Sequence, residues 1–220
     1  MTTQVKLFEA IAAHDTQKVR DLLAAQPELV NARNEQGDSP LLLALYSDFT
    51  DIRDELLAAK PELSVFEAAA LGNTARVREL LRDDPRLLNF FSHDGWTPLH
   101  LAVYFGHRDT AAELLDLGAD LHAISQNSST VMPLHSALAR GRIKLALLLI
   151  DRGADVTAPQ LTHGYTPLHY AAVVGSEEAV RKLLDAGADP SVAALDGKLP
   201  ADMATDKGHI AVADLLRSLS

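Results

Sequence analysis

The chain has 220 residues, of which 47% are hydrophobic and only 5% aromatic, and this composition argues against global disorder and favours closely packed helices rich in Ala and Leu. The formal net charge of −10 argues against a nucleic-acid partner, because phosphate binding needs clustered Lys and Arg. The chain has no Cys, which excludes disulfides and thiolate metal sites.

The sequence shows no targeting or membrane signal. Residues 1–10 contain one Lys and no long apolar run, so they do not resemble a secretory signal. The most apolar stretch, Leu145–Ile150, is too short to span a bilayer and closely follows Arg142 and Lys144. We therefore expect a cytoplasmic protein with no membrane partner.

One four-residue phrase recurs along the chain and predicts a helix start each time. Its clearest copies are Thr97-Pro98-Leu99-His100, Met132-Pro133-Leu134-His135 and Thr166-Pro167-Leu168-His169, and weaker copies begin at Ser39-Pro40 and Leu199-Pro200. A hydroxyl residue before Pro favours a helix start, because the hydroxyl caps a free N–H and Pro fits the first turn. An Ala stands four residues after each Pro, and two further copies keep the Ala without the Pro. In chain order these anchor residues are Ala10, Ala44, Ala68, Ala102, Ala137, Ala171 and Ala204.

A second signature keeps the same register. A Leu stands twelve residues after each anchor, and in six of the seven copies the next residue is Leu or Ile. These leucines are Leu22, Leu56, Leu80, Leu114, Leu149, Leu183 and Leu216. Between the two signatures, Gly106, Gly141, Gly175 and Gly208 predict the end of a first helix, where a left-handed residue is needed. We therefore predict seven helix–turn–helix copies, each with a Leu pair on the buried stripe of its second helix.

These motifs resemble the ankyrin repeat: Thr-Pro-Leu-His, Gly-His at Gly106-His107, and Leu-Leu-x-x-Gly-Ala-Asp ending at Asp120. The resemblance is strongest from Asp94 to Asp189. It implies an all-α ankyrin-repeat solenoid of stacked helix-turn-helix units with β-hairpin fingers, formed by residues 1–220 as one domain. The loose consensus favours a bacterial source. The approximate repeats are 4–34, 35–63, 64–92, 93–125, 126–160, 161–194 and 195–220.

One spacing differs from the rest. The anchors are separated by 34, 24, 34, 35, 34 and 33 residues, so the step from the second to the third copy lacks about ten residues. In the family this is roughly the length of one finger. We therefore expect a direct helix-to-helix link after Lys60 and a notch in the row of fingers. The polar, Ser-rich segment 123–131 is expected to form an enlarged finger tip.

Histidines recur once per copy at His100, His135 and His169, which could suggest a metal site. Equivalent positions in a stack of packed helices lie roughly 10 Å apart, whereas zinc ligands converge at about 2 Å. We therefore expect no metal, and the resemblance implies that each imidazole ties the turn of its own repeat together. His93 and His163 are expected in fingers, in contact with solvent.

The sequence contains no recognisable catalytic arrangement. Ser125 lies near His122 and Asp120, but nothing there resembles a strained nucleophile turn with an oxyanion hole. The chain also lacks a Gly-rich phosphate loop and a His-Glu-x-x-His helix. We expect no catalytic residue, no cofactor and no enzymatic activity.

The resemblance places partner binding on a concave face, built from the finger tips and the exposed ends of the first helices. Carried over by position, the partner-binding residues are Asp94, Trp96, Tyr104, Phe105, Arg140, Tyr165, Val173 and Val174; earlier copies place Tyr46-Ser47 and Ala70-Leu71 at the same positions. Aromatic residues are enriched at binding hot spots, and the only Trp falls in this set. The alternative is that Trp96 and Tyr165 only pack against the adjacent finger. Asp94, beside the patch, would favour a basic partner.

The function expected from these features is a monomeric, non-catalytic scaffold or adaptor that binds a protein partner, and no nucleic acid, on its concave face. An alternative is an inhibitor or antitoxin-like regulatory partner of a basic enzyme or nucleic-acid-binding protein. The acidic charge would favour this alternative, although solubility explains the same charge. A third possibility, an enzyme or small-molecule binder, would need a deep polar pocket of which the sequence gives no sign.

Overall fold

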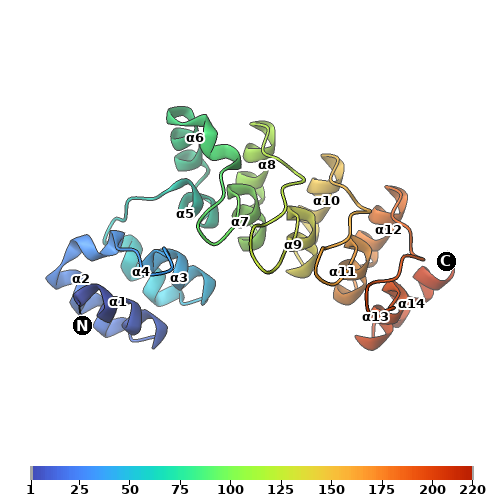
Figure 1. Ribbon diagram of the computed structural model, residues 1–220, viewed down its shortest axis with the longest axis horizontal. Helices are drawn as coiled ribbons and strands as arrows, with labels where there is room; N and C mark the ends of the chain where they lie inside the picture. The colour runs from blue at the N-terminus through green and yellow to red at the C-terminus, as the bar shows by residue number, and fades with distance from the viewer. Residues whose placement is uncertain (1, 220) are drawn as a thin grey trace.

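The computed structural model describes residues 2–219, and every regular element within them is helical (Figure 1). The first helix of each pair packs on the first helix of the next pair, so the pairs form one elongated stack with the chain ends at opposite ends. This confirms the predicted all-α solenoid. The described elements are α1 (Thr3–Ala12), α2 (Thr16–Ala25), the 3-10 helix η1 (Pro27–Asn31), α3 (Pro40–Tyr46), α4 (Thr50–Ala58), α5 (Val65–Ala70), α6 (Thr74–Asp83), the 3-10 helix η2 (Pro85–Asn89), α7 (Pro98–Phe105), α8 (Arg108–Asp116), α9 (Pro133–Ala139), α10 (Ile143–Asp151), α11 (Pro167–Val174), α12 (Glu177–Asp185), α13 (Pro200–Asp206) and α14 (Ile210–Arg217).

Helix α7 shows how local sequence determines both ends of a first helix. Pro98 occupies its first turn, and the Thr97 hydroxyl accepts a hydrogen bond from the His100 N–H at 3.3 Å. Gly106 ends the helix at φ +93°, a left-handed conformation that costs glycine little. The first two copies place His14 and Asp48 at the same position, at φ +54° and +56°, where an L side chain is strained.

The predicted Leu register defines the core in five copies. The leucines of this register with 0% exposure are Leu56, Leu114, Leu149, Leu183 and Leu216. In the other two copies the first leucine, Leu22 or Leu80, is only half-buried, and the next one is buried instead: Leu23 is 6% exposed and Leu81 is 7% exposed. These are the copies in which a 3-10 helix packs back on the second helix. The extra packing shifts the buried stripe by one residue.

The fingers are hairpin-shaped turns, because residues 2–219 contain no β-strand. The finger before α7 is closed by a hydrogen bond from the Ser92 N–H to the Trp96 carbonyl at 2.8 Å. The finger before α9 is longer and is closed from the Ser125 N–H to the Val131 carbonyl at 2.9 Å. A strand ladder needs a series of such bonds between extended segments. The predicted β-hairpins are therefore reduced to turns, and the largest turn lies in the predicted Ser-rich segment.

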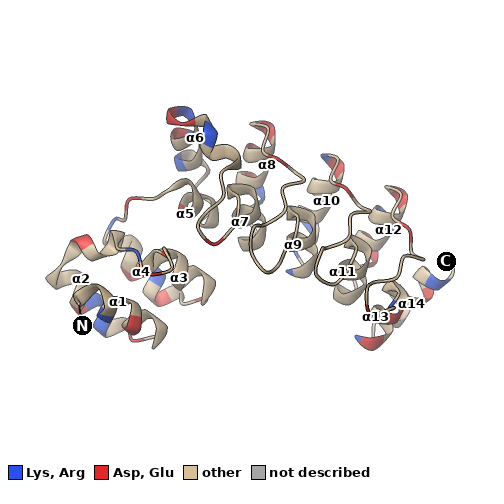
Figure 2. Cartoon of the chain, viewed as in Figure 1, with Lys and Arg blue, Asp and Glu red and all other residues tan. Residues whose placement is uncertain are grey.

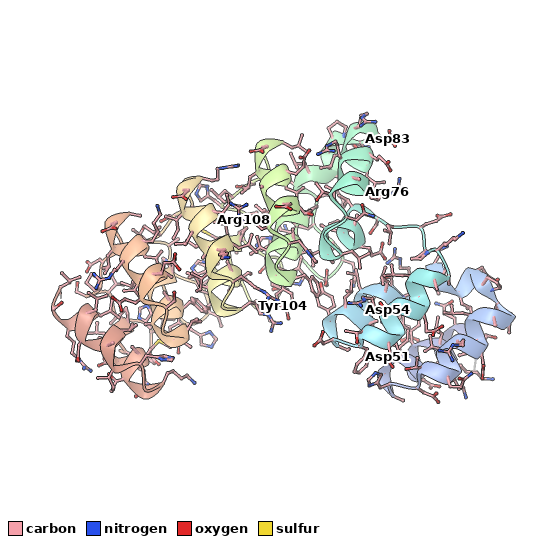
Figure 3. The ribbon with its side chains drawn as sticks, turned by 180° about the vertical axis from the view of Figure 1, so that it is seen from behind. Asp51, Asp54, Arg76, Asp83, Tyr104 and Arg108 are labelled. Carbon is pink, nitrogen blue, oxygen red and sulfur yellow. The ribbon has the colours of Figure 1, made fainter. Side chains whose placement is uncertain are left out.

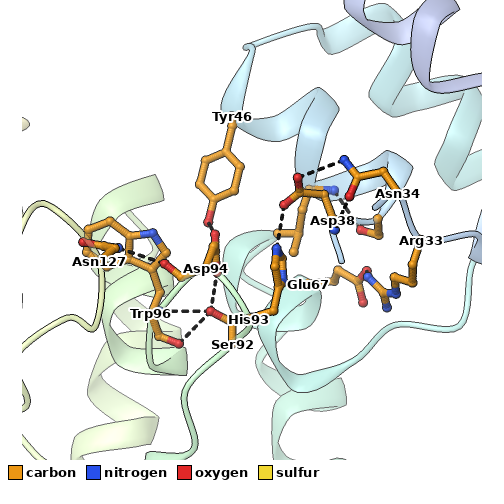
Figure 4. A network of polar contacts seen from close by, with 12 residues as sticks. Arg33, Asn34, Asp38, Tyr46, Glu67, Ser92, His93, Asp94, Trp96 and Asn127 are labelled. Atoms are coloured by element: carbon orange, nitrogen blue, oxygen red, sulfur yellow. Dashed lines mark hydrogen bonds and ion pairs between the residues drawn. The ribbon is translucent and has the colours of Figure 1, made fainter. Parts of the chain in front are cut away.

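The predicted break after the second copy is present. Residues 59–64 link α4 directly to α5, and the row of second helices is interrupted between α4 and α6. The predicted notch in the fingers is wrong: finger 34–38 meets finger 92–96 directly, with His93 Nε2 2.9 Å from Asp38 Oδ1 (Figure 4). Because one finger is missing, its two neighbouring fingers contact each other. The gap in the stack therefore lies on the side of the second helices, between α4 and α6.

The break also divides the hydrophobic core. One cluster of buried residues lies within α1–α4, and a second covers α5–α14 and includes Leu42 from α3. We call these parts the N-terminal block (α1–α4) and the C-terminal block (α5–α14). Figure 1 shows the N-terminal block tilted away from the regular rows of the C-terminal block.

Candidate partner-binding groove

Two clefts lie side by side along the ends of the first helices. The finger cleft, of about 630 Å³, lies between the fingers and helices α7 and α9. The junction cleft, of about 510 Å³, lies between the two blocks. Tyr46, Tyr104 and Arg140 line both clefts. We call the two clefts together the groove.

Aromatic rings from both blocks meet where the clefts join. Tyr46 and Tyr104 are the equivalent residues of α3 and α7, two positions after the anchor Ala, and their ring centroids lie 6.2 Å apart. The Trp96 ring lies 6.2 Å from Tyr104, and the Phe105 ring lies 5.6 Å from Tyr46. Figure 3 shows Tyr104 on the side of α7 that faces the N-terminal block. All four rings are half-buried, so they combine a packed base with an accessible surface.

Arg140 covers the edge of this aromatic cluster. It is the residue after α9 and is exposed, and its Cζ lies 4.7 Å from the centroid of the Tyr104 ring. A guanidinium at this distance is attracted by the negative face of the ring. The contact places a cation at the boundary between the two clefts.

Asp94 is held by neighbours within the chain (Figure 4). Its carboxylate accepts a hydrogen bond from the Tyr46 hydroxyl at 2.7 Å and another from the Ser92 hydroxyl, and its carbonyl accepts one from Asn127 Nδ2 at 2.9 Å. Burial, and then the hydrogen bond to Asp94, raise the pKa of Tyr46 far above its usual value. The carboxylate therefore joins the two blocks, and its hydrogen-bonding capacity is largely used internally.

Tyr165 belongs to a neighbouring aromatic group. Its ring stacks on His163 with centroids 5.5 Å apart and lies 6.1 Å from Tyr170, and its hydroxyl donates to Asp196 Oδ2 at 3.4 Å. His163 and Tyr170 line the finger cleft, whereas Tyr165 lines neither cleft. Tyr165 thus packs on His163 and Tyr170 of its own copy, and its hydroxyl reaches Asp196 of the next finger.

The structure gathers some predicted binding residues and separates others. Trp96 packs on His100, with centroids 5.4 Å apart, but keeps a half-exposed face in the finger cleft. Val173 and Val174 are half-buried and line neither cleft. The predicted residues that line the groove are Asp94, Trp96, Tyr104, Phe105 and Arg140.

Among the groove residues that sequence reasoning missed are Arg142 and Tyr170. Arg142 lines the junction cleft, and Tyr170 lines the finger cleft. One signal for Arg142 was available: the Gly-His pair at Gly106-His107 and Gly208-His209 is replaced by Gly141-Arg142, so a permanent cation stands where those two copies place an imidazole. Tyr170 falls inside a helix, one residue before its anchor, where the pattern predicts packing.

The recurring histidines bind main-chain groups across the boundary between copies. In the fourth copy, His100 Nδ1 lies 2.8 Å from the Thr97 hydroxyl, and Nε2 lies 3.0 Å from the Val131 carbonyl of the next finger. His169 repeats the arrangement with the Lys198 carbonyl at 3.1 Å. Burial lowers the pKa of His100 to about 4, although the hydrogen bond to Val131 opposes this shift. Each neutral ring therefore ties its own turn together, as the resemblance implied, and also attaches the next finger.

The acidic charge of the chain lies mainly away from the groove. Figure 2 shows Asp and Glu at the free ends of α6, α8, α10 and α12, along the row of second helices. The last residues of these four helices are Asp83, Asp116, Asp151 and Asp185. Within residues 2–219 no helix is long and apolar enough to cross a bilayer.

Comparison with known proteins identifies the family. A family model described as "Ankyrin repeats (3 copies)" matches residues 65–160 and 124–194, more than half of the chain. The chain is 36% identical over 152 residues to a homolog of transient receptor potential cation channel subfamily A member 1 from Caenorhabditis elegans, which covers 69% of this chain and 12% of that protein. It is 29% identical over 158 residues to the target of rapamycin complex 2 subunit AVO2 from Saccharomyces cerevisiae, covering 71% and 37% respectively.

A third relative covers more of the chain. The nuclear factor NF-kappa-B p105 subunit of Gallus gallus is 28% identical over 191 residues, covering 79% of this chain and 19% of that protein. The chain thus spans between 12% and 37% of the length of these three relatives. All three come from eukaryotes, so they lend no support to the bacterial source that the loose consensus suggested. On the strength of the repeat pattern, the helical stack and the matched family model, the chain belongs to the ankyrin-repeat family.

Proposed function

We propose that this chain is a non-catalytic cytoplasmic scaffold or adaptor that holds a protein partner in the groove. Ankyrin repeats are a protein–protein interaction domain, and this chain carries them over most of its length. One of its relatives is, by name, a subunit of target of rapamycin complex 2. The proposal adds the binding face to these general properties.

The observation that carries the proposal is the aromatic cluster beneath Arg140. Trp, Tyr and Arg are the residue types most enriched among binding hot spots, where a few well-packed anchors supply most of the affinity. Here Trp96, Tyr104 and Arg140 stand together in a cleft of about 630 Å³. A repeat stack presents such a surface on rigid helices, so little entropy is lost on binding.

The alternative role, as an inhibitor or antitoxin-like partner of a basic enzyme, depends on the acidic charge. Figure 2 shows acidic residues at the free ends of α6, α8, α10 and α12, away from the groove. A basic partner would therefore be attracted to a different surface, and we favour the scaffold or adaptor role.

Site-specific cross-linking tests the binding face. A photoreactive amino acid would replace Ser128, an exposed residue that lines the finger cleft, and Glu178, an exposed residue of α12, would serve as the control position. Cross-linking in cells should join the Ser128 variant to one defined protein and leave the Glu178 variant unreacted. Cross-links confined to Glu178 would move the interface to the second helices.

The captured protein would then be purified for affinity measurements. Trp96→Ala and Tyr104→Ala should each weaken its binding by about 2 kcal/mol, as for other buried aromatic anchors. Phe90→Ala is the matched control, since Phe90 is 60% exposed and lines neither cleft. Equal losses for all three variants would contradict the assignment of the groove.

A further inference from the structure

The groove contains arginines that have no ionic partner within the chain. Nine other arginines form an ion pair with a carboxylate. Arg82, Arg108, Arg140 and Arg142 form no such pair in the part of the chain that the structure describes. Two of these four line the junction cleft, and Arg140 lines the finger cleft as well.

Both groove arginines lie against the C-terminal turn of α7. Arg140 lies over the Tyr104 ring, 4.7 Å from its centroid. A methyl group added at Gly106 would lie only 3.0 Å from Arg142 Nε, so this guanidinium rests on the backbone of the same turn. Burial, and secondarily the positive charge of Arg142, lower the pKa of His107, which follows that glycine. Two permanent cations and a neutral imidazole therefore border the groove at one place.

The carboxylates of the groove leave these cations uncompensated. Asp94 accepts hydrogen bonds from Tyr46 and Ser92, and Asp54 is held by Arg53 Nε and Nη2 at 2.9 and 2.7 Å. Asp48 is the remaining carboxylate among the lining residues. The groove therefore presents open cationic donors in a chain whose net charge is −10.

We infer that the groove binds an extended segment of a partner protein in which an Asp or Glu stands beside an aromatic or large apolar residue. Arg140 and Arg142 receive the carboxylate, because a guanidinium fork matches a carboxylate with two parallel hydrogen bonds. The apolar side chain packs on the rings of Tyr46, Trp96 and Tyr104. This inference rests on the proposed function and specifies the chemistry of its partner.

A carboxylate suits the site better than a phosphate. Asp48 and Asp54 line the same cleft as the two arginines and repel an anion in proportion to its charge. A phosphorylated side chain carries nearly twice the charge of a carboxylate at pH 7. The surrounding negative charge of the chain adds to this difference.

A displayed library of random twelve-residue peptides tests the inference on the complete chain. Peptides would be selected on the unmodified protein and, in parallel, on the double variants Arg140→Gln/Arg142→Gln and Arg82→Gln/Arg108→Gln. The second double variant is the matched control, because it removes the same charge from exposed arginines outside the groove. We expect acidic residues adjacent to aromatic or large apolar ones on the unmodified and control proteins, and loss of this signature on the groove variant.

Trp96 provides the quantitative measurement, since it is the only Trp of the chain and lines the finger cleft. The fluorescence of Trp96 would be followed as the best selected peptide is titrated, with circular dichroism checking the fold of each variant. We expect about a tenfold loss of affinity for each groove arginine removed, and no loss for the control. Replacing the peptide carboxylate with an amide should cause the same loss of affinity as removing the groove arginines. The losses from the amide peptide and from the arginine variant should not add, because both changes remove one interaction.

Several outcomes would overturn the inference. These are enrichment of basic peptides, equal binding to both double variants, a higher affinity when the acidic residue is replaced by a phosphorylated one, or no enrichment of any peptide. The proposed function is judged separately, by cross-linking from Ser128. A partner captured there whose binding is unaffected by Arg140→Gln/Arg142→Gln would uphold the groove as an interface and refute the acidic anchor.

Discussion

Lowering the pH should destabilise the stack through His100, and the size of the effect follows from its burial. The pKa of His100 is about 4 in the folded chain, against 6.5 for an ordinary histidine. Between these two values the unfolded chain binds a proton at His100 and the folded chain does not. The contribution of the neutral His100 ring to the free energy of unfolding is therefore complete above pH 6.5 and is lost as the pH falls towards 4.

The magnitude is large for a single side chain. Each pH unit within this window is worth about 1.4 kcal/mol, so His100 should lower the free energy of unfolding by about 2 kcal/mol at pH 5 and by about 3 kcal/mol below pH 4. The pKa values of His135 and His169 are also lowered by burial, so these residues act in the same direction. Among the described residues the His100 ring bonds Thr97 and the Val131 carbonyl and no carboxylate, so protonation would place an uncompensated charge there.

Urea unfolding at pH 7, 6 and 5, followed by circular dichroism, would measure this effect. The test variant is His100→Gln, whose amide can still donate to the Val131 carbonyl but does not titrate. Its loss of stability between pH 7 and pH 5 should be smaller than that of the unmodified chain by about 2 kcal/mol. Exposed His122→Gln is the control and should match the unmodified chain. Parallel pH profiles for His100→Gln and the unmodified chain would show that His100 is not buried in its neutral form.

Four further outcomes are expected. Leu114→Ala should lower the free energy of unfolding by about 2–5 kcal/mol in urea, since the side chain is completely buried, and a loss below about 0.5 kcal/mol would contradict its place in the core. Truncation before Leu195 removes α13 and α14, which pack on α11 and α12, so size-exclusion chromatography should show association; a monomeric, soluble product would refute their role as a cap. Asp48→Gly should raise the thermal midpoint, with a gain of up to about 1 kcal/mol, because it relieves a left-handed φ of +56°; an unchanged midpoint would mean that the aspartate makes a compensating contact. Added zinc should leave the melting temperature unchanged, because the His100 ring nitrogens are engaged within the chain and the Nε2 of His135 bonds a carbonyl; a zinc-dependent rise abolished by replacing both residues would overturn this.

The helices were predictable because their signals act over a few residues. Thr97 and Pro98 start α7, and Gly106 ends it, through contacts confined to one helical turn. The buried register of Leu114 also followed from spacing alone, because the second helix of each copy must cover the next copy. Where a 3-10 helix packs back on the second helix, as beside Leu80, the buried register shifted by one residue. The reason is that this tertiary contact changed which face of the second helix is buried.

The groove was predictable only in part. Position within the repeat was sufficient to identify Trp96, Tyr104 and Arg140 as groove residues. It could not indicate that the Asp94 carboxylate is held within the chain, because the Tyr46 hydroxyl that binds it lies 48 residues earlier. It overlooked Arg142, because its exposure depends on the packing of the α7 turn beside it.

The sequence by itself determined the repeat family, the order of the helices and most of the core, since these depend on short-range capping and on a periodic apolar stripe. The tertiary structure decided how the missing finger is accommodated. Asp38 and His93 come within 2.9 Å because stacking closes the gap on the finger side. The tertiary structure also decided which charged side chains have no ionic partner, because ion pairs such as Arg78 with Glu113 form between neighbouring copies. Pairing of this kind depends on the distance and tilt between stacked helices, which side-chain packing determines and a linear pattern does not contain.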